Sequence, residues 1–329
     1  MKIKFLIIAT VVLLSSCYND NDDTISKSQE SIESIDFKQK MREFVIGISQ
    51  YSKTMNPNFY VIPQNGIELV STTGDLSGFP HSNYLDAIDA NGQEDLFYSS
   101  ENDNQATPSD RTEYLKKLLN ISKNSGNKIL IIDFCSTNTD ISDSYSQNNN
   151  NNYTSFATTE IGLNSIPPTP INQENDSNVV NIDNAKIFLY IINPTHYKSK
   201  SEFIAAVNKT NYDLIIMDLF FKGIPFTASE INQLKNKENG GKRLVISYMS
   251  IGEAESYRYY WQSNWALNKP NWLDEENPEW KGNFKVKYWD QNWQNIIYGN
   301  NNSYLKKILD ANFDGVYLDM IDSFDYYTK

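Results

Sequence analysis

The residues best suited to chemistry are carboxylates that follow short apolar runs. Asp319 comes directly after the apolar residues 316–318, and Asp322 follows three residues later. Further acids and polar side chains lie near the ends of other apolar runs, namely Glu253, Glu255, Arg258, Tyr248, Asp218, Asn65 and Asp133. A helix cap or a surface ion pair would explain any single one of them. Their repetition is harder to explain in this way, because burying charge without a role is costly.

A pair of such carboxylates could divide acid and base chemistry between its two members. One carboxyl group protonates a leaving oxygen, while the other acts as a nucleophile or as a base on water. Glu94 is a further candidate, placed by its sequence at the start of an apolar run or in the loop before it. Acids at the carboxyl ends of parallel strands are typical of the active sites of α/β barrels.

Eight short apolar runs are predicted to be the strands that position these residues. They are rich in Val, Ile, Leu, Phe and Tyr. They are also continuous rather than alternating, which is typical of strands buried on both faces of a parallel sheet. Their ranges are 59–64, 94–100, 128–134, 153–158, 186–193, 213–221, 243–250 and 314–320.

Helical patterns lie between the predicted strands. They cover residues 37–55, 109–126, 199–210, 227–241 and 302–312. This alternation predicts an α/β fold, and specifically a (β/α)₈ TIM barrel. A protein of two α/β domains is the alternative, with the polar stretch 137–152 as its linker. Because the alternation resumes after this stretch, we interpret it as a surface loop.

The order of the elements is unusual for such a barrel, because the chain starts with a helix and ends on a strand. Helix 37–55 has no strand before it, and strand 314–320 has no helix after it. Chain termini often lie close together in space. We therefore expect a circularly permuted barrel in which helix 37–55 packs beside strand 314–320, and strand 59–64 pairs with that strand in parallel.

Motifs and charge argue against several classes of function. The two histidines, His81 and His196, are not in a metal-ligand spacing, and no nucleophile elbow, Walker loop or dinucleotide-binding motif is present. We therefore expect no metal and no cofactor. The formal net charge of −12 becomes −14 if Lys2 and Lys4 leave with a signal peptide. Such an acidic surface repels phosphate backbones, so nucleic acid is not an expected partner, and we expect a monomer.

The tryptophans gather in one long connection between strands 243–250 and 314–320. Connections of this length are unusual unless they are functional. We interpret most of these tryptophans as the core of an extra helical layer and one or two as lining a cleft that binds sugar rings. Together with paired carboxylates, this pattern favours glycoside hydrolysis. The six tryptophans are at positions 261, 265, 272, 280, 289 and 293.

The N-terminal residues resemble the signal of a bacterial lipoprotein. Residues 1–16 combine two lysines with an apolar run that is too short to span a membrane stably, and Cys17 follows as the residue to be lipidated. Residues 17–36 are predicted to be a disordered tether and residues 37–329 a single domain. We expect a protein of the bacterial cell envelope, at the outer membrane or cell surface, that contacts the membrane only through its lipid anchor. An ordinary signal peptide is the alternative.

Three segments resemble glycoside hydrolase family 114, the endo-α-1,4-polygalactosaminidase-like TIM-barrel domain. They are "LVISYMSIGEAESYRYYW", "NPEWKGNFKVKYWDQNWQNIIYG" and "YLKKILDANFDGVYLDMIDSF". The resemblance is specific in its G-E-x-E-x-Y-R and F-D-G-V motifs and covers roughly residues 186–325. Residues 37–100 resemble the later part of the family domain. The resemblance thus covers nearly the whole chain after the tether, with the family's second half first.

The resemblance implies roles for the candidate residues. The family's proposed catalytic pair would be Asp319 and Glu94. Its implied substrate is an α-1,4-linked galactosamine polymer, which is a polycation when deacetylated and is compatible with an acidic protein. The residues matching the G-E-x-E-x-Y-R run would bind substrate or hold the pair, and further residues would have secondary roles there: Glu253, Glu255, Arg258, Tyr248, Asp218, Asn65, Asp322 and Asp133.

Two other functions are compatible with the same sequence. One is a non-catalytic lipoprotein that binds oligosaccharide on the same barrel, which would bind glycans tightly and release no product. The other is a structural or interaction role for a barrel that has lost its activity. The number of acids at predicted strand ends argues against the second of these.

Overall fold

Parallel strands form the centre of the protein in a computed structural model, which describes residues 35–101, 104–168 and 170–328. One parallel sheet has five strands in the order β1 (Tyr60–Pro63), β13 (Gly315–Asp319), β9 (Leu244–Ser250), β6 (Leu214–Asp218) and β5 (Phe188–Ile191). A second has three, in the order β2 (Ala90–Glu94), β3 (Lys128–Phe134) and β4 (Thr154–Thr158). Single parallel bridges join the two, between Gln64 and Gly92 and between Ser155 and Ile187. The protein is a mixed α/β structure with a parallel central sheet.

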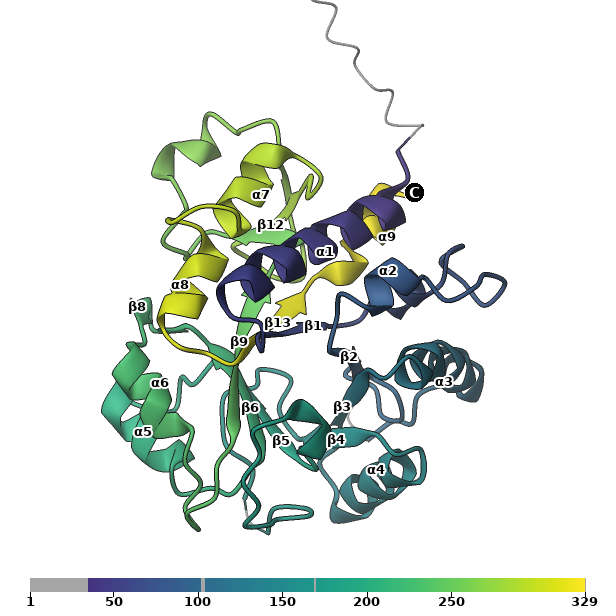
Figure 1. Ribbon diagram of the computed structural model, residues 1–329, viewed down its shortest axis with the longest axis vertical. Coiled ribbons are helices and arrows are strands. Elements are labelled where there is room, and N and C mark those ends of the chain that lie inside the picture. The colour runs from purple at the N-terminus through teal and green to yellow at the C-terminus, as the bar shows by residue number, and fades with distance from the viewer. Residues whose placement is uncertain (1–34, 102–103, 169, 329) are drawn as a thin grey trace, which may run out of the picture. The chain divides into compact units, whose positions relative to one another are not determined.

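Helices lie around the outside of these strands (Figure 1). The larger ones are α1 (Phe37–Met55), α3 (Ser109–Asn124), α4 (Asn138–Asn150), α5 (Lys200–Val207), α6 (Ala228–Leu234), α7 (Gln291–Ile297) and α8 (Tyr304–Asp310). Shorter elements are the helices α2 (Ser82–Leu85) and α9 (Phe324–Tyr327) and the hairpin β7 (Phe220–Phe221) and β8 (Ile224–Pro225). The 3₁₀ turns are η2 (Ile67–Val70), η3 (Ile182–Asn184), η4 (Ser263–Ala266) and η5 (Ile321–Ser323). The apolar face of α1 is fully buried, as its helical spacing predicts, at Met41, Phe44 and Ile48.

The predicted pairing of the first and last long strands is confirmed. β1 runs parallel to β13, with Tyr60 opposite Gly315 and Pro63 opposite Leu318. Helix α1 lies against β1 and against α8 and α9, the helices before and after β13. The expectation that the chain ends on a strand needs correction, because η5 and α9 follow β13.

The stretch 137–152 is a helix, α4, and the prediction of a surface loop is wrong. Thr137 caps the helix by accepting a hydrogen bond from the Asp140 amide. Ser144 and Asn148 are its buried residues, and both donate to the carboxylate of Asp133 on β3, at 2.7 and 3.0 Å. A helix that docks through polar side chains has no apolar stripe for a pattern to detect.

The second predicted strand also lies elsewhere in the sequence. The strand is β2, "ANGQE", and the predicted run 94–100 is mostly loop after it. Leu96, Phe97 and Tyr98 in that loop are buried, which explains their apolar character. The correction moves Glu94 from the start of a strand to its carboxyl end.

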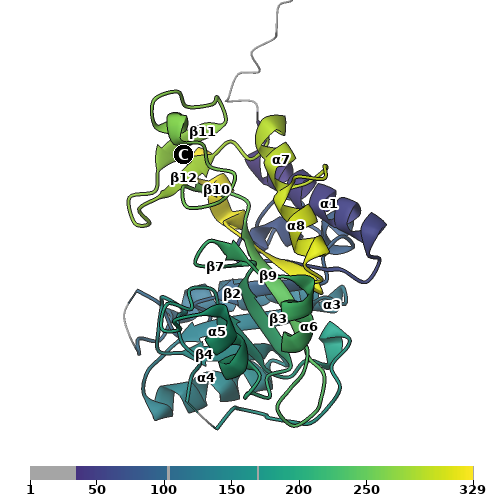
Figure 2. The same ribbon diagram turned by 90° about the vertical axis from the view of Figure 1, so that its left-hand side faces the viewer.

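A small antiparallel sheet lies beyond the carboxyl end of β9 (Figure 2). Its order is β10 (Glu253–Glu255), β12 (Asn283–Val286) and β11 (Leu273–Glu276). Four of the tryptophans are in successive ring contact in this region, in the order Trp261, Trp265, Trp272 and Trp293. Most tryptophans therefore form a core, as expected, but that core belongs to a sheet with short helices rather than to a helical layer.

Three aspartates link neighbouring parallel strands at their amino ends. Each lies directly before a strand, accepts a backbone N–H from the neighbouring strand's start and pairs with a lysine. Asp89 accepts from Val61, Asp213 from Lys186 and Asp314 from Val245, all at 2.8 Å. Their lysine partners are Lys53, Lys237 and Lys235, at 3.1, 2.6 and 2.7 Å. Such bonds fix the register of neighbouring strands.

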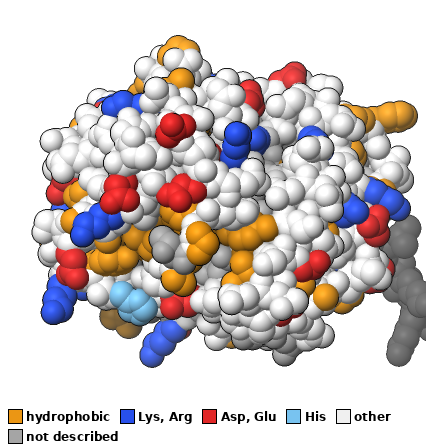
Figure 3. Space-filling view, turned by 90° about the horizontal axis from the view of Figure 1, so that it is seen from below, with side chains coloured by type: hydrophobic (Ala, Val, Ile, Leu, Met, Phe, Trp, Pro, Cys, Tyr) orange, Lys and Arg blue, Asp and Glu red, His pale blue; other side chains and the backbone are white. Residues whose placement is uncertain are grey.

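The surface and the ends of the chain complete the description. On the face seen in Figure 3, apolar side chains gather across the middle, and charged side chains of both signs are scattered around them. No helix among the described residues is long and apolar enough to cross a membrane. The predicted lipidation site Cys17 and the predicted signal peptide lie outside the described residues.

Candidate active site

Glu94 and Asp319 occupy the carboxyl ends of β2 and β13, the two strands on either side of β1. Both side chains lie on the face of the strands turned away from the helices, which we call the inner face. Gly92 and Tyr317, two residues earlier on the same strands, meet on that face. A Cβ added to Gly92 would lie 2.0 Å from the Tyr317 hydroxyl, so only glycine fits there. Asp319 is close enough for its charge to raise the pKa of Glu94.

A network of amides holds Glu94. Asn65, just after β1, donates from Nδ2 to Glu94 Oε2 at 3.1 Å, and its Oδ1 accepts from the Glu94 amide at 3.0 Å. Gln93 Nε2 also donates to Asn65 Oδ1, at 3.1 Å. Burial, and secondly the charge of Asp319, raise the pKa of Glu94 to about 8, against the lowering effect of the Asn65 hydrogen bond. Glu94 therefore carries a proton at neutral pH.

Asp319 is held in a different environment. The Tyr248 hydroxyl donates to its Oδ2 at 2.7 Å, and the Met320 amide donates to its Oδ1 at 2.8 Å. Burial raises the pKa of Asp319 to about 6, while these two donors lower it. Met320 has a left-handed φ of 62°, an uncommon conformation for this residue type that recurs at functional sites. The two carboxyl groups thus differ in protonation at neutral pH.

A cavity of about 420 Å³ opens beside Glu94. Its lining includes Asn65 and Gln93 together with Asp322, whose pKa is raised to about 7 by burial and by the charges of Asp319 and Asp325. The other charged residues that line it are mostly acids: Glu68, Asp95, Glu101, Asp325 and Arg111. Asp319 is not among the lining residues, but its charge acts on two of them, Glu94 and Asp322. The cavity is strongly acidic.

The motif after β9 forms a buried ion cluster. Arg258 lies between Asp218 at the end of β6 and Glu255 on β10, at 2.7 and 2.5 Å. Glu253 is fully buried and binds Lys285 at 2.6 Å and Asn277 at 2.8 Å. Burial is the largest cause of the raised pKa of Asp319, and the charges of Glu255 and Glu253 raise it further. The sequence-predicted residues Glu253, Glu255, Arg258 and Asp218 therefore come together, and their carboxylates are bound to protein cations.

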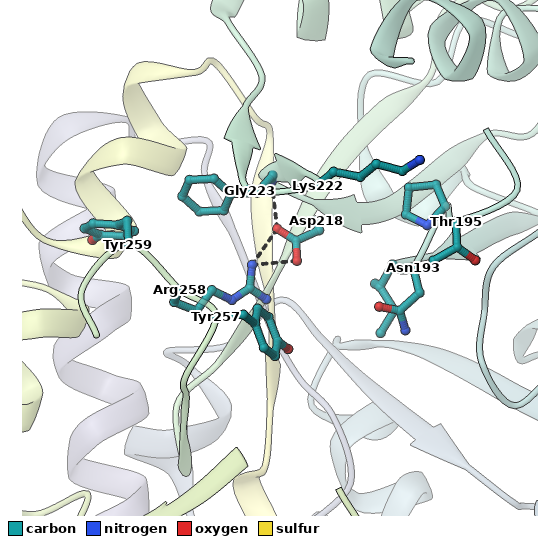
Figure 4. A pocket seen from close by; sticks show the side chains of 11 residues that line it. Asn193, Thr195, Asp218, Lys222, Gly223, Tyr257, Arg258 and Tyr259 are labelled. Atoms are coloured by element: carbon teal, nitrogen blue, oxygen red, sulfur yellow. Dashed lines mark hydrogen bonds and ion pairs between the residues drawn. The ribbon is translucent and has the colours of Figure 1, made fainter. Parts of the chain in front are cut away.

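A second cavity of about 290 Å³ lies beside this cluster. Figure 4 shows Asp218 and Arg258 pointing toward each other, with Tyr259 on one side and Asn193 and Thr195 on the other. The cavity is bounded by the segments after β5, β6 and β9. No tryptophan among the described residues lines this cavity or the one beside Glu94, so the expected cleft tryptophans are replaced by Phe220, Tyr257 and Tyr259.

Aromatic residues that the sequence interpretation missed form the floor beneath the two carboxylates. Tyr190 and Tyr317 are in ring contact at 5.3 Å, and the Tyr190 hydroxyl donates to Gln64 Oε1 at 3.0 Å. The charges of Glu94 and Asp319 act on both tyrosines, whose pKa values are raised chiefly by burial. Their positions inside apolar strands made them look like ordinary core residues. The alternation of β13 was the available signal, because Tyr317 shares a face with Asp319.

Asp133 does not join this site. Its side chain faces α4, where it accepts from Ser144 and Asn148, and the Phe97 amide donates to it at 2.9 Å. It is fully buried. This arrangement favours a structural role that ties α4 to β3. Among the described residues, no group of three His, Cys, Asp or Glu side chains is placed to hold a metal ion.

Comparison with known proteins identifies the second half of the chain. The model of glycoside-hydrolase family GH114 matches residues 172–329, a range that includes Asp319 and the ion cluster but not Glu94. An uncharacterized protein of Methanocaldococcus jannaschii is 40% identical over 161 residues, 48% of this chain and 43% of the relative. Uncharacterized proteins of Thermotoga maritima and Deinococcus radiodurans are 36% and 40% identical over 123 and 120 residues, covering 37% and 36% of this chain. The matches span 36% of each of these two relatives, so the chain covers less than half the length of all three. The match over residues 172–329 supports membership of glycoside-hydrolase family GH114.

Proposed function

We propose that the protein is a glycoside hydrolase of the bacterial cell envelope that cleaves an amino-sugar polysaccharide within the chain. The observation that carries this proposal is the pair Glu94 and Asp319. They lie on one face, at the ends of the two strands on either side of β1, with pKa values raised to about 8 and about 6, and Glu94 lines a cavity. Two carboxyl groups with different protonation states are what glycoside hydrolysis requires.

The two members of the pair take different roles in this mechanism. Glu94 holds a proton at neutral pH and gives it to the leaving glycosidic oxygen. Asp319 is ionised, with Tyr248 and the Met320 amide fixing its two oxygens. It acts as the nucleophile or as the base on water. Asn65 orients Glu94 through two hydrogen bonds.

We also propose that the eight parallel strands close into a permuted (β/α)₈ barrel. The bridges Gln64–Gly92 and Ser155–Ile187 support closure, because they join the two parallel sheets at both edges. The pairing of β1 with β13 supports the permutation, because it places the first strand beside the last. In this arrangement both cavities lie at the carboxyl ends of the strands, where barrels of this class place their active sites.

An α-1,4-linked galactosamine polymer is the proposed substrate. The acids around the Glu94 cavity, of which only Glu68 pairs with the lining residue Arg111, suit a chain that carries protonated amines. A lipid anchor at Cys17 would hold the enzyme at the outer membrane or cell surface, as a monomer without cofactor. These assignments rest on the sequence pattern and on the charge of the cavity.

Cleavage of a defined polymer tests the proposed function. The protein is incubated with an α-1,4-linked galactosamine polymer, and the products are identified by mass spectrometry. Oligosaccharides of intermediate length are expected, because an endo-acting enzyme cuts inside the chain. Binding of the polymer without any product would instead identify an oligosaccharide-binding protein, and neither binding nor cleavage would reject the proposed substrate.

The pH dependence of cleavage is expected to be bell-shaped. Activity should rise as pH passes about 6, where Asp319 ionises, and fall as pH passes about 8, where Glu94 loses its proton. The measurement is kcat/KM on the polymer between pH 4 and pH 10. In Glu94→Gln the residual activity should lose its alkaline limb, because the titrating acid is gone. A profile that rises steadily through pH 9 would contradict the assignment of Glu94 as the acid.

A further inference from the structure

The cavity beside Asp218 and Arg258 differs in chemistry from the cavity beside Glu94. Its lining contains one carboxylate, Asp218, and both of that group's oxygens are already bound. Oδ1 accepts from the Phe220 amide at 2.7 Å and from Arg258 at 2.8 Å, and Oδ2 lies 2.7 Å from Arg258. No lining acid is thus left to receive a cationic group.

Lys222 adds a positive charge to the edge of this cavity. Its backbone has a left-handed φ of 48°, and its ammonium group donates to the Tyr197 carbonyl at 2.9 Å. This bond leaves the charge of Lys222 uncompensated by any carboxylate in the lining. A protonated amino sugar would therefore meet like charge here, whereas the Glu94 cavity presents an excess of acids.

The same cavity has the groups that bind an uncharged sugar. Tyr257 and Tyr259 line it and are 62% and 43% exposed, so their rings are available to the apolar face of a pyranose. Tyr257 is held in place by its hydroxyl, which donates to Glu255, and by the Arg258 guanidinium over its ring. Asn193 and Thr195 are exposed on the opposite side and supply polar groups for hydroxyl or acetamido substituents (Figure 4).

The ion cluster connects this cavity to the proposed catalytic pair. Arg258 lines the cavity and binds Glu255, and the charge of Glu255 acts on Asp319. β9 and β13, which lead to the cavity and to Asp319, are neighbouring strands. A polysaccharide chain that lies over these strand ends would place different sugar units in the two cavities.

We propose that the Asp218–Arg258 cavity is a subsite for an uncharged sugar unit, such as an N-acetylated one, in a chain whose protonated amino sugars bind beside Glu94. This inference rests on the proposed function. It makes the substrate a heteropolymer, and it makes Lys222 and Tyr257 the residues that select the uncharged unit. The selection combines stacking on Tyr257 with repulsion of amines by Lys222.

Two forms of one oligosaccharide test the subsite. Steady-state rates are measured on α-1,4-linked galactosamine oligosaccharides that are either fully deacetylated or half N-acetylated. The wild type should have the lower KM for the half N-acetylated form. Lys222→Glu should shift this preference toward the fully deacetylated form by roughly tenfold, chiefly through KM. Lys209→Glu makes the same change in net charge at an exposed position two residues after the end of α5 and should keep the wild-type preference.

The outcomes separate this inference from the proposed function. Equal KM values for both forms in the wild type, or an unchanged preference in Lys222→Glu, would overturn the subsite while leaving the hydrolase intact. If the wild type cleaves neither form, the proposed function fails, and calorimetry with the half N-acetylated oligosaccharide still tests the subsite. Binding should then be weakened by Tyr257→Ala and kept by Tyr257→Phe, which retains the ring. Equal affinity of the wild type, Tyr257→Ala and Tyr257→Phe for the oligosaccharide would reject the subsite.

Discussion

Replacing Asp319 with Asn is expected to lower kcat on the galactosamine polymer by roughly 10²- to 10⁴-fold. The amide is nearly isosteric and can still accept from Tyr248 or the Met320 amide, so the strand end should keep its structure. What it lacks is the negative charge needed to attack, or to activate water. Glu94→Gln should lower kcat by a similar factor, because an amide cannot give up a proton as a carboxylic acid does. Asn65 can still donate a hydrogen bond to the glutamine side chain.

The comparison needs measurements of folding as well as of rate. Thermal unfolding should show both variants as stable as the wild type or more so, since each removes a carboxyl group that burial disfavours in its charged form. Asp310→Asn, at an exposed position on α8, is the matched control and should keep full activity. The kcat of the double variant should be only slightly below that of the less active single variant, because the two groups act as a unit. Full activity in either single variant would reject the pair.

Lys237→Met is expected to lower the free energy of unfolding by about 3–5 kcal/mol. The Lys237 ammonium and the Asp213 carboxylate form an ion pair at 2.6 Å in which both side chains are 0% exposed. Methionine keeps the length of the side chain but leaves Asp213 buried without its cation. Among the described residues, the Lys186 amide and Asn175 would remain as hydrogen-bond donors to Asp213, at 2.8 and 3.1 Å. Denaturation by urea gives the free energy directly.

A second lysine provides the control for this change. Lys235 pairs with Asp314 in the same way, but both side chains are 22% exposed, so water can replace the lost cation. Lys235→Met should therefore cost about 1 kcal/mol or less. Adding Asp213→Asn to Lys237→Met should recover part of the loss, because it removes the unpaired charge. Equal destabilisation by the two lysine variants would show that burial does not set the cost.

The strands that consist mainly of apolar residues could be predicted from the sequence, including β13 with Asp319, but the polar strand β2 with Glu94 could not. β3 was predicted with its observed bounds, because Ile129 to Ile132 are apolar and buried on both faces. β2 was missed because most of its residues are polar or glycine, and each is buried through a specific contact that the sequence does not reveal. Asn91 accepts from Ser122 on α3, Gly92 makes room for Tyr317, and Gln93 and Glu94 bond with Asn65.

Asp133 shows why position along a strand is not enough to assign a site. It lies one residue from the carboxyl end of β3, as Asp218 and Asp319 lie at the ends of theirs. Because side chains alternate between the two faces of a strand, however, Asp133 points toward α4 and not toward the inner face. The loop predicted at α4 was wrong because this helix docks on the Asp133 carboxylate through Ser144 and Asn148 and has no apolar stripe. Only the pairing of strands and helices reveals which face an acid meets.

The aspartates at the amino ends of the strands have a consequence for the chemistry at the other ends. β13 is five residues long, with Asp314 before it and Asp319 as its last residue. A slip of one residue would turn Asp319 toward the helices and present an apolar neighbour in its place. The bond from the Val245 amide to Asp314 prevents this slip. Asp314 therefore fixes the register that turns Asp319 toward the inner face. A substitution at Asp314 would misplace the Asp319 carboxylate and impair catalysis, although Asp314 touches no substrate.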